Sequence, residues 1–140
     1  MYTYNYPRAA LTVDAIVFVK EGNAFFVLLI ERGREPFKNT WALPGGFIEM
    51  DETLETACKR ELLEETGLSV DKMTQFKTYD AIDRDPRHRT ISVIYFTELN
   101  EKKEVNGGDD AARAGWFPVS DLSELAFDHR QILEEFFDNL

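Results

Sequence analysis

The chain has few of the residues and segments that mark secreted or membrane proteins. Its single cysteine, Cys58, excludes an intrachain disulfide and is interpreted as a small core residue. Apolar runs such as AIVFV and FFVLLI are far shorter than the roughly 20 residues that a membrane-spanning helix needs. The N-terminus MYTYNYPRAA lacks the basic and then apolar order of a secretory signal. We therefore expect a cytoplasmic protein with no membrane partner.

Positive charge is also scarce. The chain has 16 Lys and Arg residues against 26 Asp and Glu residues, for a formal net charge of −10. Nucleic-acid binding relies on Lys and Arg to neutralise phosphates, so this balance predicts no nucleic-acid partner. A small phosphorylated ligand stays compatible, because a few Arg residues and divalent cations can reverse the field inside one pocket.

The length and the apolar patterning predict one folded domain over residues 1–140. Residues 32–46 are expected to be mostly loop with a short extended piece at WAL, and residues 101–110 to be a mobile loop. The remaining pattern predicts an α/β domain with helices packed against a mixed β-sheet. The expected strands are residues 9–19, 25–31, 73–82, 90–99 and 114–119, and the expected helices are residues 53–66 and 129–140.

The helix expected at residues 53–66 is crowded with carboxylates. Residues three and four apart share a helix face, so Glu61, Glu64 and Glu65 should project close together, with Arg60 placed to brace Glu64. Neighbouring carboxylates repel unless a pKa rises or a cation binds. Oxygen ligands without His or Cys suit Mg²⁺ first and Mn²⁺ second. For an isolated stretch of this kind, a solvated helix face would be the better interpretation.

These glutamates belong to a longer pattern between residues 46 and 68. The sequence there matches every fixed position of the Nudix box, at Gly46, Glu52, Arg60, Glu61, Leu62, Glu64, Glu65, Gly67 and Leu68. The chain therefore resembles the Nudix hydrolases. The resemblance implies a Nudix-type α/β/α sandwich with a mixed β-sheet, in which the box forms a loop, a helix and a loop.

The resemblance also implies metal ligands. Glu61 and Glu65 match the principal ligands of the divalent cations that hold a diphosphate. Glu64 matches a further ligand or a water-positioning residue, and the backbone carbonyl of Gly45 matches a common additional ligand. The implied chemistry is attack of water on phosphorus with Mg²⁺ neutralising the developing charge.

Two other box residues are implied to organise this site. Arg60 matches the residue that orients the glutamates, and Glu52 matches an acid that is structural or supports the metal ligands from behind. Both are therefore grouped with Glu61, Glu64 and Glu65 as candidate catalytic residues.

The segments flanking the box resemble those of short bacterial and archaeal ADP-ribose pyrophosphatases. The similar stretches are RGREPFKNTWALPGGFIEMDE and DRDPRHRTISVIYF. This resemblance implies cleavage of ADP-ribose to AMP and ribose 5-phosphate. The candidate substrate-binding residues are Arg32, Phe47, Arg84, Arg87 and Arg89, because guanidinium groups pair with phosphate oxygens and aromatic rings stack on bases.

Competing interpretations remain for these flanking residues. The arginines of the DRDPR segment are equally suited to pair with Asp83 and Asp85 and so fold the loop. Phe37 and Trp41 are further stacking candidates, although a core position suits Trp41 at least as well.

The general base is sought in the loop before the last strand, where related pyrophosphatases often place an acid. That loop supplies Glu104, Asp109 and Asp110 as possible general bases. The two aspartates also suit a simple turn or cap.

Three functions compete. The first is hydrolysis of a nucleoside diphosphate linked to another moiety, with ADP-ribose preferred. The second is hydrolysis of modified nucleoside triphosphates, which the box equally permits. The third is an ADP-ribose-sensing domain, since regulators of NAD metabolism resemble the same segments. A homodimer is expected, because twofold dimers are the commonest oligomers.

Overall fold

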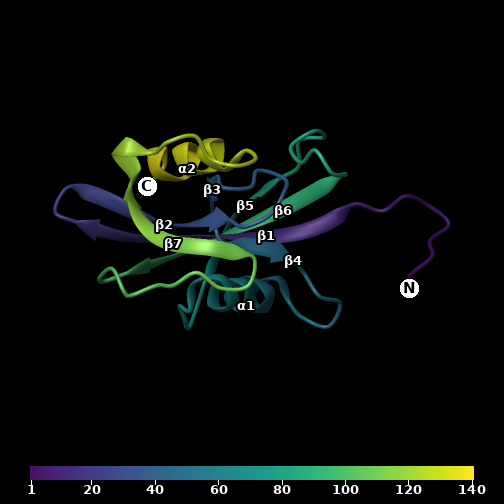
Figure 1. Ribbon diagram of the computed structural model, residues 1–140, viewed down its shortest axis with the longest axis horizontal. Helices are drawn as coiled ribbons and strands as arrows, with labels where there is room; N and C mark the ends of the chain where they lie inside the picture. Colours follow the sequence, from purple (N-terminus) through teal and green to yellow (C-terminus); the bar gives the residue numbers. More distant parts are fainter.

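A mixed β-sheet lies between two helices in the computed structural model, which describes residues 1–140. The helix α1 (Leu54–Thr66) covers one face of the sheet and α2 (His129–Asp138) covers the other (Figure 1). This arrangement confirms the α/β/α sandwich. The strands are β1 (Ala10–Glu21), β2 (Ala24–Arg32), β3 (Trp41–Ala42), β4 (Gly45–Phe47), β5 (Thr74–Tyr79), β6 (Thr90–Leu99) and β7 (Ala111–Pro118), and a 3-10 helix η1 (Val119–Asp121) follows β7.

The strand order explains where the sheet opens. The main path is β3-β2-β1-β6-β5, with β4 paired to β1 and β7 paired to β2. Only β1 and β6 run parallel; every other pair is antiparallel. One edge of β1 pairs with β2 through Phe18–Glu21 and with β4 through Thr12–Asp14. Because β2 and β4 share that edge, they separate between these two points.

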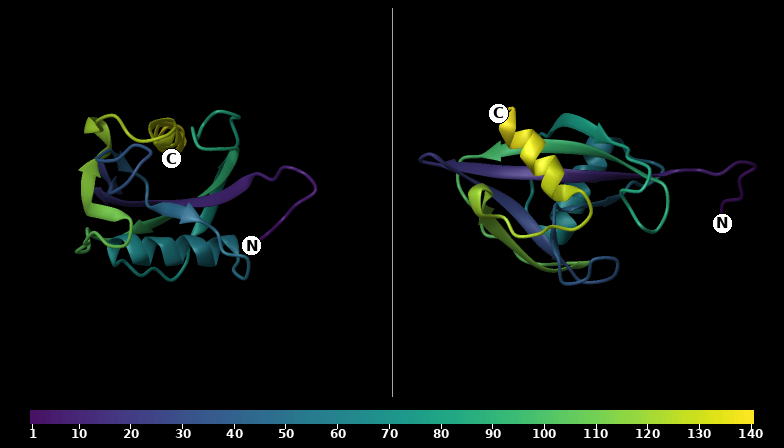
Figure 2. Two further views of the ribbon diagram at one scale, coloured as in Figure 1. Left: turned by 45° about the vertical axis from the view of Figure 1, so that its right-hand side comes forward. Right: turned by 90° about the horizontal axis from the view of Figure 1, so that it is seen from above.

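The central strand β1 is buried on both faces because its side chains alternate between two cores. Val13, Ala15 and Val17 pack in the cluster that contains the buried face of α1. Ile16 and Phe18 pack in the cluster that contains the buried face of α2. A strand covered on both sides has a continuous apolar run, as the sequence AIVFV does. Figure 2 shows the two helices on opposite sides of this strand.

The helix α1 has local signals at both ends, and its prediction is confirmed. Thr53 caps the first turn, where its hydroxyl accepts a hydrogen bond from the amide of Thr56 at 3.2 Å. Gly67 ends the helix at a φ of 77°, and its amide donates to the carbonyl of Leu63 at 2.9 Å. A residue with a Cβ would be strained at that φ, so the glycine of the box has a structural reason.

Three details differ from the sequence-based expectation. Strand β4 was not predicted, because a three-residue segment rich in glycine has no strand pattern and forms only by pairing with β1. Strand β7 begins at Ala111, earlier than residue 114, since its first residues pair with β2. Strand β5 ends at Tyr79, so the expected strand at 73–82 was too long. Neither helix has the length and hydropathy to cross a membrane.

Candidate active site

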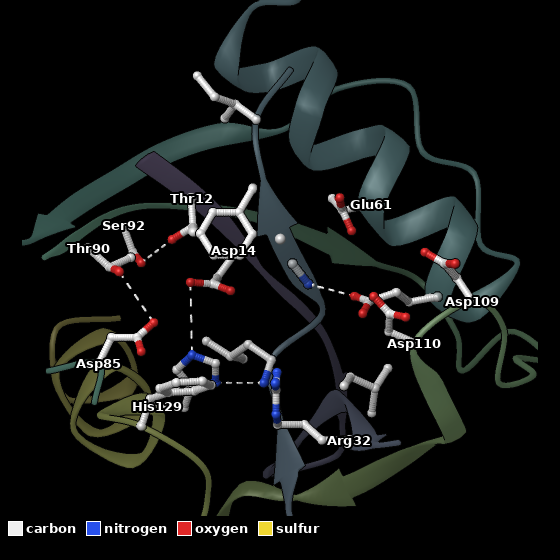
Figure 3. A pocket seen from close by; sticks show the side chains of 18 of the residues that line it. Thr12, Asp14, Arg32, Glu61, Asp85, Thr90, Ser92, Asp109, Asp110 and His129 are labelled. Carbon is white, nitrogen blue, oxygen red and sulfur yellow. Dashed lines mark hydrogen bonds and ion pairs between the residues drawn. The ribbon is translucent and has the colours of Figure 1, made fainter. Parts of the chain in front are cut away.

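A polar cavity of about 550 Å³ opens beside the point where β2 and β4 separate. Its walls come from β1, β2, β4 and α1, from the loop between β5 and β6, from the loop before β7 and from the start of α2. In Figure 3, Glu61, Asp109 and Asp110 lie toward α1, whereas Thr12, Thr90 and Ser92 lie on the far side of Asp14. The cavity therefore has an acidic side and a hydroxyl-rich side.

The acidic side is formed by Glu61 and Glu65, which lie one turn apart on α1 and both line the cavity. They pack closely against the two glycines of β4. A Cβ at Gly46 would lie 2.6 Å from the carboxyl carbon of Glu61, so no other residue fits there without a shift. The amide of Gly45 donates to Glu65 Oε1 at 2.8 Å. The glycine pair thus allows both carboxylates to face the cavity from beside the backbone.

Arg60 connects the acidic residues of the box. Its guanidinium pairs with Glu52 at 2.6 Å, with Glu61 at 2.9 Å and with Glu64 at 3.3 Å. The hydrogen bond from Arg60 lowers the pKa of Glu52 and raises that of Arg60 itself. Glu64 is exposed and does not line the cavity. Arg60, which itself lines the cavity, therefore orients Glu61.

Burial makes the carboxylates facing the cavity hard to ionise. Desolvation raises the pKa of Glu65 to about 8, opposed by the amide of Gly45 and reinforced by the charge of Glu61. Desolvation also raises the pKa of Glu61, and nearby Glu64 and Asp109 add to the rise. A bound cation would reverse both shifts by favouring the charged forms.

The side chains on the acidic side are of the kind that bind a hard divalent cation. Four carboxylates line this side of the cavity, and no His or Cys accompanies them there, as Mg²⁺ and Mn²⁺ prefer. No three of the acidic side chains meet closely enough here to surround one ion. Glu61 Oε1 instead accepts a hydrogen bond from Arg60, and Glu65 Oε1 accepts one from the amide of Gly45. The four carboxylates belong to Glu61, Glu65, Asp109 and Asp110.

The loop at residues 101–110 reaches the cavity by docking on the end of α1. The amide of Asn106 donates to the carbonyl of Thr66 at 3.0 Å, and a Cβ at Gly108 would lie 2.6 Å from the carbonyl oxygen of Glu64. This contact brings Asp109 and Asp110 into the wall, where Asp110 pairs with Arg34. Glu104 is exposed and lies outside the lining.

Three of the four candidate arginines, Arg32, Arg84 and Arg87, line the cavity. Arg32 lines it and donates to the carbonyl of Pro36 at 2.7 Å. Arg87 lines it and pairs with Asp85 at 2.8 Å. Burial, followed by repulsion from Arg87, lowers the pKa of Arg32. Two close cations facing one cavity favour an anionic ligand.

Arg84, although it lines the cavity, and Arg89 are held by acceptors within the protein. The side chain of Arg84 is only 4% exposed and donates to both carboxyl oxygens of Asp128, at 2.9 and 2.7 Å. The contact with Asp128 connects the β5–β6 loop to the start of α2. Arg84 also donates to Ser92 Oγ at 2.5 Å. Arg89 donates to the carbonyl of Asp80 at 2.7 Å and does not line the cavity. Neither pairs with Asp83 or Asp85, so Arg87, which pairs with Asp85, is the arginine that fits the loop-folding interpretation.

Sequence reasoning missed the buried pair beneath the cavity, Asp14 and His129. His129 Nδ1 accepts the amide hydrogen of Leu43 at 2.9 Å, and its Nε2 lies 3.9 Å from Asp14 Oδ2. Burial lowers the pKa of His129 to about 3, so the ring is neutral and able to accept. Burial raises the pKa of Asp14 to about 7. A single aspartate inside the apolar run of β1 was the one available signal.

The aromatic candidates divide between the cavity and the core. Phe47 lines the cavity. Trp41 packs against Phe117 at a centroid distance of 4.6 Å, in the core cluster under α2. Phe37 lies at the cavity edge against Phe127, with 4.7 Å between ring centroids. The core interpretation of Trp41 is therefore the better one.

The comparison with protein families agrees with this geometry. The NUDIX domain model matches residues 8–140. The chain belongs to the Nudix family. Nudix proteins are mostly pyrophosphohydrolases and typically use a divalent metal.

Individual Nudix relatives include an enzyme and a regulator. An ADP-ribose pyrophosphatase of Methanocaldococcus jannaschii is 40% identical over 94% of this chain and 75% of the relative. An ADPR-responsive transcriptional repressor of Acinetobacter baylyi is 34% identical over 97% of this chain, which spans only 56% of that relative. The NUDIX domain of Shewanella oneidensis NrtR, solved in complex with ADP ribose, superposes with a TM-score of 0.89 at 32% identity over 96% of this chain and 90% of that one.

Proposed function

We propose that this Nudix protein is a Mg²⁺-dependent ADP-ribose pyrophosphatase that hydrolyses ADP-ribose to AMP and ribose 5-phosphate. The observation that carries the proposal is one cavity that contains Glu61 and Glu65, the guanidinium groups of Arg32 and Arg87, and the ring of Phe47. Carboxylates suit cations, guanidinium groups suit phosphates and a ring suits a base. The likeness to an archaeal ADP-ribose pyrophosphatase supports this substrate.

Glu61, Glu65 and the carbonyl of Gly45 are proposed to hold Mg²⁺, or Mn²⁺ in second place, with Glu64 as a further ligand. Bound cations would neutralise the diphosphate and lower the pKa of the attacking water. Glu64 lies outside the cavity and pairs with Arg60. To act as a metal ligand, Glu64 would therefore have to rotate its side chain away from Arg60.

The other side chains are proposed to bind, orient and accept a proton. Arg32 and Arg87 would bind phosphate oxygens, and Arg60, with Glu52, would keep Glu61 oriented. Asp109 and Asp110 are the candidate general bases, because both line the cavity within the electrostatic reach of Glu61 and Glu65. Asp110 pairs with Arg34, so Asp109 is the freer of the two.

Product analysis tests the proposal directly. The purified protein with Mg²⁺ is incubated with ADP-ribose, NADH, diadenosine polyphosphates, nucleotide sugars and nucleoside triphosphates. We expect AMP and ribose 5-phosphate from ADP-ribose, with kcat/KM well above that of every other compound. Preferential turnover of triphosphates would keep the Nudix chemistry and overturn the substrate.

A second candidate function is ADP-ribose sensing without turnover. It is supported by the likeness to a repressor described as ADPR-responsive and to a NUDIX domain bound to ADP ribose. All glutamates of the box are present in this chain, which favours hydrolysis. Measurable ADP-ribose binding with no products in the same assay would favour the sensor.

The homodimer and the lack of a nucleic-acid partner stay predictions. Sedimentation analysis of the purified protein would test the first, and a shift assay with duplex DNA at low salt would test the second.

A further inference from the structure

Two phenylalanines beside the cavity have a backbone conformation that suits glycine. Phe37 has a φ of 61° and Phe127 a φ of 54°. Bulky residues avoid this left-handed region, and they persist there only where the surroundings hold them. The two rings contact each other, with 4.7 Å between centroids and 58° between planes. Two separate loops are therefore both strained at the place where they meet.

Phe127 lines the cavity and is surrounded by cations. The guanidinium carbon of Arg32 lies 5.0 Å from the ring centroid of Phe127, and that of Arg87 lies 5.7 Å away. Arg87 also lies 5.2 Å from the ring centroid of Phe47. The guanidinium of Arg87 thus contacts both aromatic side chains of the cavity.

Core packing accounts for only part of the position of Phe127, which packs at the edge of the small cluster of Ile30, Ala42, Ala111 and Ala126. Its neighbours Leu125 and Ala126 are buried, whereas Phe127 itself is only half-buried and borders the cavity. The residue after it, Asp128, is bound by Arg84, and the next, His129, accepts from Leu43. These two contacts fix the chain on one side of Phe127, and Phe37 supports its ring on the other. Strain that is held in this way beside a cavity is typical of a ligand contact.

We propose that Phe127, supported by Phe37, is the surface on which the nucleobase of the ligand stacks. The inference deepens the proposed function, because it places the base on Phe127 beside Arg32 and Arg87 and leaves Glu61 and Glu65 for the cations that hold the diphosphate. Aromatic rings and guanidinium planes both stack on bases without needing base-specific hydrogen bonds. A base inserted beside Phe127 would stack on the ring and keep the neighbouring Arg32 and Arg87 available for phosphate.

A pair of ligands that differ only by the base tests this inference. AMP is ribose 5-phosphate with adenine attached, and neither is cleaved at a diphosphate. Calorimetric titration with Mg²⁺ measures both affinities for the wild type and for Phe127→Leu. We expect AMP affinity to fall about tenfold, the effect of losing one stacked base, while ribose 5-phosphate affinity stays within about twofold. Phe127→Tyr, which restores the ring, should bind AMP as the wild type does.

Two controls separate stacking from folding. Phe137→Leu makes the same change on α2, where Phe137 packs against Phe18 and Phe25, and it should leave both affinities unchanged. Phe127→Gly removes the ring and suits the positive φ. It should bind AMP as weakly as Phe127→Leu does, and its Tm should be no lower than that of Phe127→Leu. A lower Tm for the glycine variant would indicate that Phe127 serves the fold.

The remaining outcomes overturn the inference without touching the proposed function. Equal loss of both ligands in Phe127→Leu would show that the ring only braces Arg32 and Arg87. Unchanged AMP affinity would show that Phe127 does not contact the base. Conversely, ring-dependent AMP binding by a protein that does not hydrolyse ADP-ribose would overturn the proposed hydrolysis alone.

Discussion

The two helices bury different kinds of side chain against the same sheet. On α2 the buried face is apolar beyond its first residue, with Ile132, Leu133 and Phe136 packed among aromatic rings. On α1 the buried residues include Glu65, which is 6% exposed, beside Ala57, Cys58 and Leu62. A buried carboxylate costs stability unless it is paired, whereas a buried phenylalanine adds to it.

This difference indicates what each layer contributes. The face under α2 holds the sheet together, and the face under α1 includes groups that oppose folding in the absence of a cation. Residues that break the ordinary rules of burial are expected at functional sites. Variants on the two helices should therefore separate activity from stability.

Glu65→Gln should have the largest effect, a loss of activity with folding retained. Turnover of ADP-ribose with saturating Mg²⁺ is expected to fall by several orders of magnitude, since a lost ligand removes charge stabilisation that is expressed in the transition state. Folding should be retained because a Gln carbonyl can still accept the hydrogen bond that Gly45 donates. Steady-state kinetics and thermal unfolding together check this.

The pH dependence of the same variant sharpens the test. The pKa of Glu65 in the folded protein is about 8, above its ordinary value of 4.5. A raised carboxyl pKa stabilises the fold at low pH, and this stabilisation is lost as pH rises toward and through 8. Metal-free Glu65→Gln should lack that loss. Near-normal turnover by Glu65→Gln, or an equal defect in the exposed control Glu134→Gln, would contradict the assignment.

Phe136→Ala should have the opposite profile. Phe136 is 3% exposed and contacts Phe18, Phe76 and Phe96 at centroid distances of 5.5, 5.1 and 5.1 Å. Its truncation is expected to lower the free energy of unfolding by about 3–5 kcal/mol. Activity per folded molecule should be unchanged, as denaturant titration and kinetics on the same sample would show. A large loss of kcat with little loss of stability would refute the division between the faces.

His129→Leu should lower both stability and activity. His129 is the first residue of α2, and its ring contacts the chain just before β4. Losing its acceptor leaves the buried amide of Leu43 unpaired, which costs about 1–3 kcal/mol. The same amide precedes Pro44 and Gly45, so kcat should fall by about tenfold as the acidic side shifts. His129→Asn offers an oxygen near the position of Nδ1 and should recover part of both losses. Full activity in the leucine variant would show that this contact does not position the site.

Glu135→Gln should produce the smallest change, visible only in acid. Glu135 accepts hydrogen bonds from Tyr79 at 2.6 Å, Lys77 at 3.0 Å and Gln131 at 3.0 Å, which lower its pKa to about 2. A lowered carboxyl pKa stabilises the fold above its unfolded value of 4.5, and the stabilisation disappears as pH falls from 4.5 toward 2. Because Glu135 is about one-third exposed, solvent screening limits the difference to under about 1 kcal/mol.

Thermal unfolding between pH 7 and pH 3 measures that difference. The wild type should lose more Tm than Glu135→Gln across this range, and Glu134→Gln should behave as the wild type. Parallel pH profiles for all three proteins would show that the hydrogen bonds to Glu135 are not a source of acid sensitivity.

Sequence reasoning succeeded where structure depends on neighbours along the chain. The helix α1 was predicted within a residue of its bounds, because Thr53, Gly67 and the apolar spacing between them all act locally. Strand β4 and the Asp14–His129 pair were not predicted from the sequence, because each depends on a partner that is distant along the chain. Asp14 and His129 lie at opposite ends of the chain and meet only when α2 packs on the sheet.

The sequence by itself determined the family, the helix of the box and the set of carboxylates on it, since spacing along one helix places those residues whatever surrounds them. Only the tertiary structure decided which arginines face the cavity. Arg32, Arg84 and Arg87 line the cavity, with Arg84 held by Asp128, whereas Arg89 is held by the carbonyl of Asp80 outside the lining. A guanidinium binds whichever acceptor folding brings to it, and for Arg84 that acceptor lies 44 residues away along the chain.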